Sequence, residues 1–401
     1  MYKTISSLNR KTSKSSTSVK DKNDKLLADP GLVKKRWMEH TEELYDADSK
    51  LKDWNLEPET EVAQDDIGPC TLEEEVMASL SDMKNNKAVE GDEIPTELLR
   101  CMGCTAVKVF THLCQKIYET GKWPEDFLQS VVILLEKKPN ATECSDFRTI
   151  SLLAHAAKVL IRILTKHIEA KVEMISYIAD DQFGFKRGKE TTDAIAALTV
   201  LGERSLQHGR DIYVCFNDYE KAFDTLKWNE MIWMLKNTGI DWKDRNLIAK
   251  KLYLGQTAFI KIKNELTGCC EIGQRVRQGC PLSPVLFNIY IQHVINKGLA
   301  DIQEWVKVGA VLVQSICFAD DHAMVSHTQR GLQRIMDALQ QTSEKYNMWI
   351  NVKKTKVMRM PGRKGRKSRI IMVNGKELES VTQFCYLRSI VTEDSRSECE
   401  V

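Results

Sequence analysis

Three aspartates stand where apolar segments end. Asp218 closes the segment that begins at Asp211, and Asp320 and Asp321 sit at a turn between two short apolar segments. If these segments are neighbouring strands of one sheet, the three carboxylates converge, and like charges gather stably only around cations. Mg²⁺ prefers hard oxygen ligands from a few carboxylates, with water and phosphate oxygens completing its shell. Two such ions about 3.5–4 Å apart can activate a hydroxyl and stabilise a departing pyrophosphate.

The triad therefore indicates metal-assisted phosphoryl transfer with two Mg²⁺ ions, or with Mn²⁺ in their place. The alternative for Asp320 and Asp321 is an ordinary turn, because Asp is common in turns. An Asp pair alone does not decide between the two.

A loop that could meet a nucleic acid lies between these carboxylates in the sequence. Gln278 and Gly279 precede Ser283, which caps a predicted helix with Pro284 at its first position. A glycine lets the backbone approach a planar base closely, and Gln278 can hydrogen-bond a template base or its sugar. Each residue would also suit a plain turn before a helix. The order of the whole set, between two carboxylate strands, favours template contact.

The composition is that of an ordinary folded chain and does not by itself indicate a nucleic-acid partner. The 401 residues are 42% hydrophobic and 28% charged, with a net charge of only +2. Basic residues do gather between Lys353 and Arg369, as in a solvated or phosphate-contacting loop. The 12 cysteines show no regular metal-binding framework. Neither a bilayer-spanning apolar run nor an apolar signal core is found, so we expect an intracellular protein, nuclear or cytoplasmic, with no membrane partner.

Apolar spacing predicts the elements that would position these residues. Alternating apolar residues indicate strands over 128–135 and 211–218, and two short strands around the Asp320 turn. Helical spacing indicates helices over 33–45, 97–120, 151–174, 224–239, 283–297 and 329–346. Asp224 is the expected N-cap of the fourth helix, and Asn347 is the expected left-handed residue after the last.

An ordered series of short motifs runs along the chain. It comprises Lys87 to Pro95, Trp123-Pro124, Phe147 to Ser151, Gln182-Phe183-Gly184-Phe185, Asp218 to Asp224, Gln278 to Pro284, Phe318 to Asp321, Ile350 to Thr355 and Phe384 to Leu387. In this order the motifs resemble those of reverse transcriptases, in the variety found in non-LTR (LINE-type) retrotransposons. The likeness spans Trp37 to Val391, and the ordered set is far more specific than any one motif.

The resemblance implies roles for the candidate residues. Asp218 and Asp320 would bind both metals, and Asp321 would complete the site. Phe223 occupies the steric-gate position, where a large ring excludes a ribose 2′-hydroxyl and favours dNTPs; its alternative is a core phenylalanine. Lys354 matches a lysine near the triphosphate and is a candidate proton donor to the leaving pyrophosphate.

Three basic residues earlier in the chain would bind the incoming nucleotide. Arg148 would hold the triphosphate, because arginine grips phosphate in a bidentate manner. Lys137 or Lys138 would lie nearby, although both lysines would equally suit a solvated loop.

Departures from the family pattern give further expectations. Asn217 puts a polar side chain on a strand where an apolar one is usual, which is expected to cost stability. Arg388 replaces the glycine of Tyr-Leu-Gly, so the tight turn of the primer-grip hairpin is expected to be disfavoured. We also expect residues 1–28 to be a disordered linker, and the chain to be a truncated copy that lacks the upstream endonuclease and most of the thumb.

The predicted fold is mixed α/β, the right-hand polymerase fold with helical fingers and a palm that holds a small antiparallel sheet. The expected segments are an N-terminal helical extension over 29–125, fingers over 126–210, a palm over 211–360, and a basic loop with a partial primer-grip hairpin over 361–401. The implied function is RNA-directed DNA polymerase, adding dNTPs to a DNA primer 3′-hydroxyl on an RNA template. Two alternatives stay open: a non-catalytic nucleic-acid-binding remnant and an RNA-templated RNA polymerase. The oligomeric state is not indicated.

Overall fold

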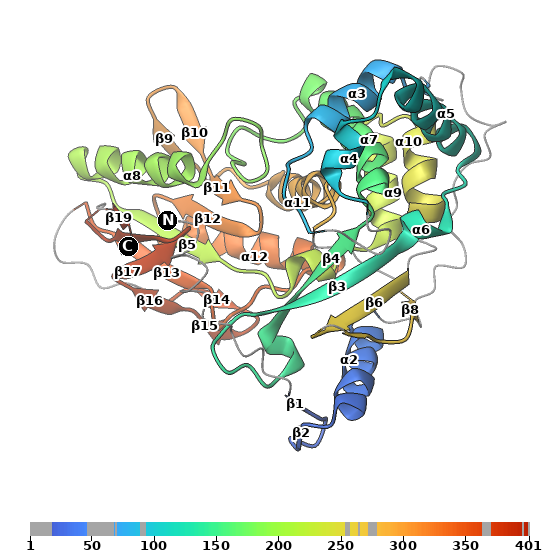
Figure 1. Cartoon of the computed structure of the whole chain (residues 1–401). Helices are drawn as coiled ribbons and strands as arrows, with labels where there is room; N and C mark the ends of the chain where they lie inside the picture. The colour runs from blue at the N-terminus through green and yellow to red at the C-terminus, as the bar shows by residue number, and fades with distance from the viewer. Residues whose placement is uncertain are drawn as a thin grey trace, which may run out of the picture. The chain divides into compact units, whose positions relative to one another are not determined.

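The chain forms two compact units. The computed structural model describes residues 18–45, 68, 70–88, 94–252, 257–263, 265–271, 279–362, 370–394 and 397–399. Unit 1 comprises residues 1–165 and 241–283, and unit 2 comprises residues 166–240 and 284–401. Figure 1 follows the chain from blue at the N-terminus to red at the C-terminus.

The core of unit 1 is a small mixed sheet. β3 pairs antiparallel with β4 and parallel with β6, which also pairs with β7 and β8. Val33 and Trp37 of α2 pack against Val132, Phe147 and Ile260 of this sheet. The elements are α2 (Pro30–Tyr45), β3 (Gln129–Glu136), β4 (Phe147–Leu153), β6 (Thr257–Ile262), β7 (Glu265–Leu266) and β8 (Cys270–Glu271) (Figure 1).

The helices of unit 1 correct two predictions. The helix expected over 97–120 is interrupted before Cys104, and the helix expected from Ser151 begins only at His155. Ser151 and Leu153 belong to β4, because they pair with Val132 and Ser130 of β3. The helices are α3 (Glu73–Ser81), α4 (Thr96–Arg100), α5 (Cys104–Thr120), α6 (Glu125–Leu128), α10 (Trp242–Leu247) with a π turn (Ile248–Leu252), and α7 (His155–Met174), which continues into unit 2.

Unit 2 is built on a five-stranded sheet with the order β11-β12-β5-β13-β16. All pairs are antiparallel except β13 with β16. Val214 and Phe216 of β5 face Leu198 of α8 in one apolar core. The strands are β5 (Ile212–Asn217), β11 (Ser315–Phe318), β12 (Asp321–Ser326), β13 (Lys356–Met360) and β16 (Glu379–Val381). The mixed α/β fold with a small, largely antiparallel sheet, predicted from the sequence, is confirmed.

Helices and hairpins surround this sheet. α8 contacts β11, and α12 contacts β5 and β12. The helix expected from Asp224 starts at Trp228, after a short 3₁₀ turn, so Lys227 and not Asp224 occupies its N-cap. Asn347 has a positive φ of 60° after α12, as predicted. The elements are α8 (Thr191–Gln207), α9 (Trp228–Asn237), α11 (Ser283–Leu299), α12 (Gln329–Lys345), β9 (Val306–Val308), β10 (Val311–Val313), β14 (Met372–Val373), β15 (Lys376–Glu377), β17 (Gln383–Tyr386), β18 (Ser389–Thr392) and β19 (Ser397–Cys399).

The stretch expected as a linker holds a hairpin. β1 (Val19–Lys20) pairs antiparallel with β2 (Leu26–Leu27), and Val19 is buried in the core of unit 1. A disordered linker is therefore wrong for residues 18–28, where apolar side chains reach the sheet. Residues 1–17 lie outside the described ranges.

The turn that Arg388 was expected to disfavour is formed. Tyr386 pairs with Ser389, and the two residues between them, Leu387 and Arg388, have φ of 51° and 64°. Positive φ at both central positions is the geometry that suits a two-residue hairpin. The strand pairing of β17 and β18 thus outweighs the preference of this turn for glycine.

β13 includes Lys356 and Arg359 of the basic segment that begins at Lys353. Lys356 forms an ion pair with Glu379 at 2.6 Å, and Arg359 forms one with Asp211 at 2.9 Å. These contacts replace the solvated loop expected there, whereas residues 363–369 lie outside the described ranges. Residues 241–283, which were expected to belong to the palm segment 211–360, are part of unit 1, because β6 pairs with β3. Among the described residues, no helix has both the length and the apolarity to cross a bilayer.

Candidate active site

The pairing of β5 with β12 brings the carboxylate segments together. Asn217 lies opposite His322, so Asp218 leaves β5 beside Asp321, the first residue of β12. On the other side, Phe318 pairs with Asp321 and leaves a two-residue turn between β11 and β12. The two strands are neighbours in one sheet, which is the condition under which the carboxylates were expected to converge.

The carboxylates influence one another electrostatically. Partial burial and the like charges of Asp320 and Asp218 raise the pKa of Asp321 to about 6. Asp321 as a whole is exposed, so water limits the effect of burial, and the neighbouring charges distinguish it from a surface aspartate. Burial also raises the pKa of Asp218, while the Lys354 ammonium opposes that shift. A cation would relieve the repulsion at this turn.

The segment from Ile350 to Thr355 is fastened to the end of β5. The Asp218 N–H donates to Thr355 Oγ1 at 3.2 Å, and the Asn351 N–H donates to the Asp218 carbonyl at 2.8 Å. These bonds bring Lys354 to the site, with its Nζ 3.5 Å from Asp218 Oδ2. The lysine side chain is 68% exposed, so its ammonium is accessible to solvent.

Gln182 and Gly184 hold the turn between β11 and β12 in place. Ala319 has a left-handed φ of 57°. Gln182 Oε1 accepts hydrogen bonds from the N–H groups of Ala319 and Gly184, each at 2.9 Å. A Cβ on Gly184 would lie 2.1 Å from the Ala319 nitrogen, so only glycine fits there. Asn288 of α11 donates to the Gly184 carbonyl at 2.8 Å and fixes this approach.

His322 has no role that its sequence context predicts, but in the structure it is bonded to the turn. Its Nε2 lies 2.9 Å from the Ala319 carbonyl and donates to it, and the ring is fully buried. Burial lowers the pKa of His322 to about 4, so the ring is neutral at physiological pH. The only signal in the sequence was a polar residue directly after the aspartate pair on an otherwise apolar strand.

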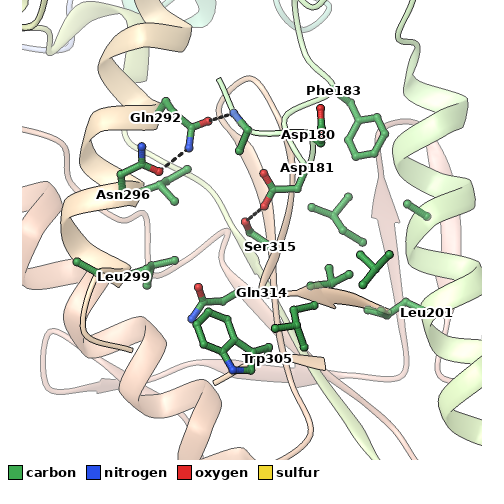
Figure 2. Close-up of a pocket in the computed structure, with 18 residues that line it drawn as sticks. Asp180, Asp181, Phe183, Leu201, Gln292, Asn296, Leu299, Trp305, Gln314 and Ser315 are labelled. Atoms are coloured by element: carbon green, nitrogen blue, oxygen red, sulfur yellow. Dashed lines mark hydrogen bonds between the residues drawn. The ribbon is translucent and has the colours of Figure 1, made fainter. Parts of the chain in front are cut away.

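Figure 2 shows how Asp181, the residue before Gln182, is joined to β11 at the edge of a pocket in unit 2. The Asp181 carboxylate accepts a hydrogen bond from the Ser315 hydroxyl, and burial raises the pKa of Asp181. The pocket has a volume of about 650 Å³, with Leu201, Leu299 and Trp305 among its lining residues. Ser315 and Ile316 of β11, the strand that leads into the carboxylate turn, also line it.

Phe223 lies in the short 3₁₀ turn Ala222–Asp224, which follows Asp218 in the chain. Its ring stacks on Phe287 of α11 with centroids 4.3 Å apart, and Phe185 meets it edge-on at 6.0 Å. Phe185 is itself half exposed and has a positive φ of 55°. Phe223 is thus half-buried, with its ring packed on Phe287.

Unit 1 holds the three basic candidates on one hairpin. Arg148 is exposed on β4 opposite Leu135 of β3, and Lys137 and Lys138 follow directly after β3. Lys137 Nζ donates to the Ser145 carbonyl at 2.8 Å, and Lys138 pairs with Asp146 at 2.9 Å. Both lysines therefore already contact the chain locally. Gln182, Phe223, Lys354 and the three aspartates belong to unit 2.

Gly279 packs against the strand that holds Arg148. Its φ is +105°, and a Cβ there would lie 2.8 Å from the Ser151 carbonyl oxygen. The close approach in the structure is to β4 of the same unit, whereas the approach expected from the sequence was to a base. Gln278 lies outside the described residues.

The carboxylates suit an ion that takes only part of its shell from protein. Within the described ranges, no three His, Cys, Asp or Glu side chains are arranged to hold a metal by themselves. Asp218 Oδ1 is nevertheless buried and lacks a hydrogen-bond partner among those residues. An unpartnered carboxylate oxygen beside two further carboxylates fits Mg²⁺, which usually keeps waters and phosphate oxygens in its shell. It does not fit a closed, all-protein metal site.

The fold is that of a polymerase-like protein. The chain is similar to the solved structure of apo telomerase from Candida tropicalis truncated from its C-terminal domain, with a TM-score of 0.50. The match covers 74% of this chain and 60% of that one at 11% identity. At this identity the likeness shows the fold alone.

The chain belongs to the reverse transcriptase (RNA-dependent DNA polymerase) family, which matches residues 135–388. It is 25% identical over 348 residues to the RNA-directed DNA polymerase from mobile element jockey of Drosophila funebris, covering 80% of this chain and 35% of that one. It is 24% identical over 224 residues to the Pol polyprotein from the type-1 retrotransposable element R2 of Nasonia vitripennis, covering 55% of this chain and 21% of that one. The chain thus spans about a third or less of the length of these relatives, and the predicted relation to non-LTR retrotransposons is confirmed.

Proposed function

We propose that this chain is an RNA-directed DNA polymerase that adds dNTPs to the 3′-hydroxyl of a DNA primer on an RNA template. The observation that supports this most directly is the pairing of β5 with β12, which places Asp218 beside the turn of Asp320 and Asp321. The family supplies the reaction class, and the jockey relative bears that activity in its name.

Asp218, Asp320 and Asp321 would hold the metal. Their mutual repulsion and the unpartnered Asp218 oxygen favour a divalent cation, with Mg²⁺ as the resident ion and Mn²⁺ as a substitute. When bound, such ions increase the acidity of a hydroxyl and stabilise the charge on a leaving pyrophosphate.

Lys354 acts on the leaving group. Its ammonium is held near Asp218 by the 350–355 segment but is largely exposed, so it can reach a phosphate oxygen and donate a proton to it. A positioned proton donor contributes roughly 10²–10⁴-fold to such a rate.

Arg148 binds the triphosphate, because it is exposed on β4 and its guanidinium can form paired hydrogen bonds with phosphate oxygens. Lys137 and Lys138 add positive charge on the same hairpin after leaving Ser145 and Asp146. Gln278 and Gly279 contact the template, and the Phe223 ring, braced by Phe287, excludes the ribose 2′-hydroxyl.

Primer extension tests the proposal. The full chain is incubated with Mg²⁺, dNTPs and an RNA template annealed to a DNA primer, beside Asp320→Ala and the matched surface change Asp301→Ala. Extension by the wild type and Asp301→Ala, but not by Asp320→Ala, is the expected result. Equal products from the wild type and Asp320→Ala would overturn it.

The same assay separates the two other functions. A nucleic-acid-binding remnant would bind the primer-template in a salt-dependent manner without extending it. An RNA-templated RNA polymerase would extend with rNTPs in the wild type, and Phe223→Val would leave that rNTP use unchanged.

A further inference from the structure

The peptide groups on both sides of Ala319 are held by buried side chains. Gln182 Oε1 accepts from the Ala319 N–H at 2.9 Å, and His322 Nε2 donates to the Ala319 carbonyl at 2.9 Å. Ala319 has φ of 57°, a conformation that costs free energy for a residue with a Cβ and persists only where its surroundings hold it. Both bonds act on the residue that immediately precedes Asp320.

We propose that Gln182 and His322 are positioning residues that clamp Ala319 in its left-handed conformation and thereby set the direction of the Asp320 and Asp321 carboxylates. This inference rests on the proposed metal site. It assigns to Gln182 and His322 a function that acts through the turn, since neither side chain is required to touch metal or substrate.

The clamp is part of a row across the sheet beneath the turn. Gln182 bridges to Cys317, Cys317 pairs with His322, and His322 pairs with Asn217. All four side chains are buried. Because packed interiors transmit strain, a change in one clamp residue is expected to reach the turn.

The close contact of Gly184 leaves the turn little room to relax. Its position against the Ala319 backbone excludes a Cβ, and the Asn288 side chain holds its carbonyl. Ala319 is therefore confined on one side by Gly184 and bonded at both ends by the clamp. Loss of either bond would let the turn rotate away from its left-handed state.

Two substitutions separate the hydrogen bonds from packing. His322→Phe keeps a ring that can pack edge-on against Tyr219, as His322 does at 5.4 Å, but removes the donor. Gln182→Met keeps the length of the side chain and removes the acceptor. The matched control is His327→Phe, which removes a histidine whose Nδ1 lies 3.1 Å from the Asp211 carbonyl, beyond the far end of β12.

Mn²⁺ binding to the full chain is measured from the electron paramagnetic resonance signal of free Mn²⁺, with circular dichroism as the check on folding. Substitutions behind metal ligands weaken binding by about 10–100-fold, and we expect at least a tenfold loss for His322→Phe and Gln182→Met. His327→Phe should bind as the wild type does, and His322→Gln, which keeps an N–H donor, should recover part of the loss. In primer extension, raising the Mg²⁺ concentration should restore much of the rate of both clamp variants.

The outcomes distinguish the clamp from the site itself. Equal Mn²⁺ affinity in the wild type and Asp320→Ala would refute the metal site. The clamp alone would be refuted if Asp320→Ala bound Mn²⁺ more weakly than the wild type while the folded clamp variants bound it as tightly as the wild type. If His322→Phe does not fold, Gln182→Met decides, because it tests the other end of the same peptide.

Discussion

Asn217 on β5 and His322 on β12 lie directly opposite each other beneath the carboxylate turn, and both side chains are almost completely buried. Neither side-chain atom of Asn217 has a hydrogen-bond partner among the described residues, and His322 Nδ1 also lacks one there. Burial raises the pKa of the neighbouring Tyr219 hydroxyl; Asn217 lies close enough to oppose that rise, but it does not reach hydrogen-bond geometry. Polar groups thus occupy a place that an apolar strand pair would fill at lower free energy.

The first prediction concerns the free-energy cost of burying the polar side chain of Asn217. Asn217→Val should stabilise the protein by about 1–2 kcal/mol, because it removes two buried polar atoms without partners and adds a β-branched side chain to a strand. Urea unfolding of the metal-free chain measures it. The exposed change Asn229→Val, on the surface of α9, serves as the control and should give no such gain. A destabilised Asn217→Val would mean that the asparagine makes contacts worth more than its desolvation.

The second prediction concerns Lys354. Lys354→Ala should lower the rate of primer extension by about 100-fold or more, because it removes the proposed proton donor to the leaving group. Lys353→Ala, on the neighbouring exposed lysine, should retain the rate. Single-turnover extension at saturating dNTP measures the step. A Lys354→Ala rate within twofold of the wild type would remove this lysine from the mechanism.

The sequence predicted the parts of the site that depend on local pattern. Alternating apolar residues located β5, and an aspartate pair between two such segments located the turn of β11 and β12. Apolar spacing did not predict the structure of Ser151 to Leu153 correctly, because these residues suit a helix or a strand equally. Their pairing with Ser130 to Val132, far along the chain, makes them a strand.

The clamp could not be predicted, because one of its bonds joins distant residues and the other is accepted by a backbone group. Gln182 reaches Ala319 across 137 positions, and His322 bonds to a backbone carbonyl that has no side-chain signature. The turn at Arg388 was misjudged for a related reason, since the register of β17 and β18 decides it and not the residue in the turn. The roles of the basic hairpin residues stay predictions, as does the template contact of Gln278.

The third prediction concerns Phe223. Phe223→Val should raise rNTP incorporation relative to dNTP by roughly 10–100-fold, because discrimination against one hydroxyl by an apolar wall is of that size. Loss of the stack on Phe287 should also lower stability somewhat. Phe127→Val, which shortens a half-buried phenylalanine of α6, controls for the loss of a ring. Competition between dATP and ATP at one template position measures the ratio, and an unchanged ratio contradicts the steric gate.

The fourth prediction follows from the raised pKa of Asp321, about 6 in the folded chain. Between its usual value near 4 and 6, the folded state binds more protons than the unfolded state, so stability falls as the pH rises through this window. In EDTA at pH 7.5, Asp321→Asn should therefore unfold at a higher temperature than the wild type. This difference in unfolding temperature should disappear as the pH falls below about 6. Added Mn²⁺ should reverse its sign, so that the wild type unfolds at the higher temperature. Asp301→Asn controls for the loss of a surface carboxylate, and an Asp321→Asn gap that is the same at pH 5 and pH 7.5 would speak against the charge repulsion.

The fifth prediction separates two costs at Gly279. Gly279→Ala should destabilise the chain by about 1–3 kcal/mol, because alanine is strained at φ of +105° and its Cβ would lie 2.8 Å from the Ser151 carbonyl. Gly188→Ala is the matched change, since Gly188 has φ of +73° but nothing within 4 Å of its Cβ position. Gly188→Ala should therefore lose only the conformational part, about 1 kcal/mol. Urea unfolding of both variants measures the difference, which reports the packing of Gly279 on β4.

Equal losses of stability in the two variants would show that the contact of Gly279 with β4 adds nothing beyond the backbone conformation. A larger loss for Gly279→Ala, together with reduced dNTP affinity, would indicate that the contact also supports the proposed binding of the triphosphate by Arg148 of β4.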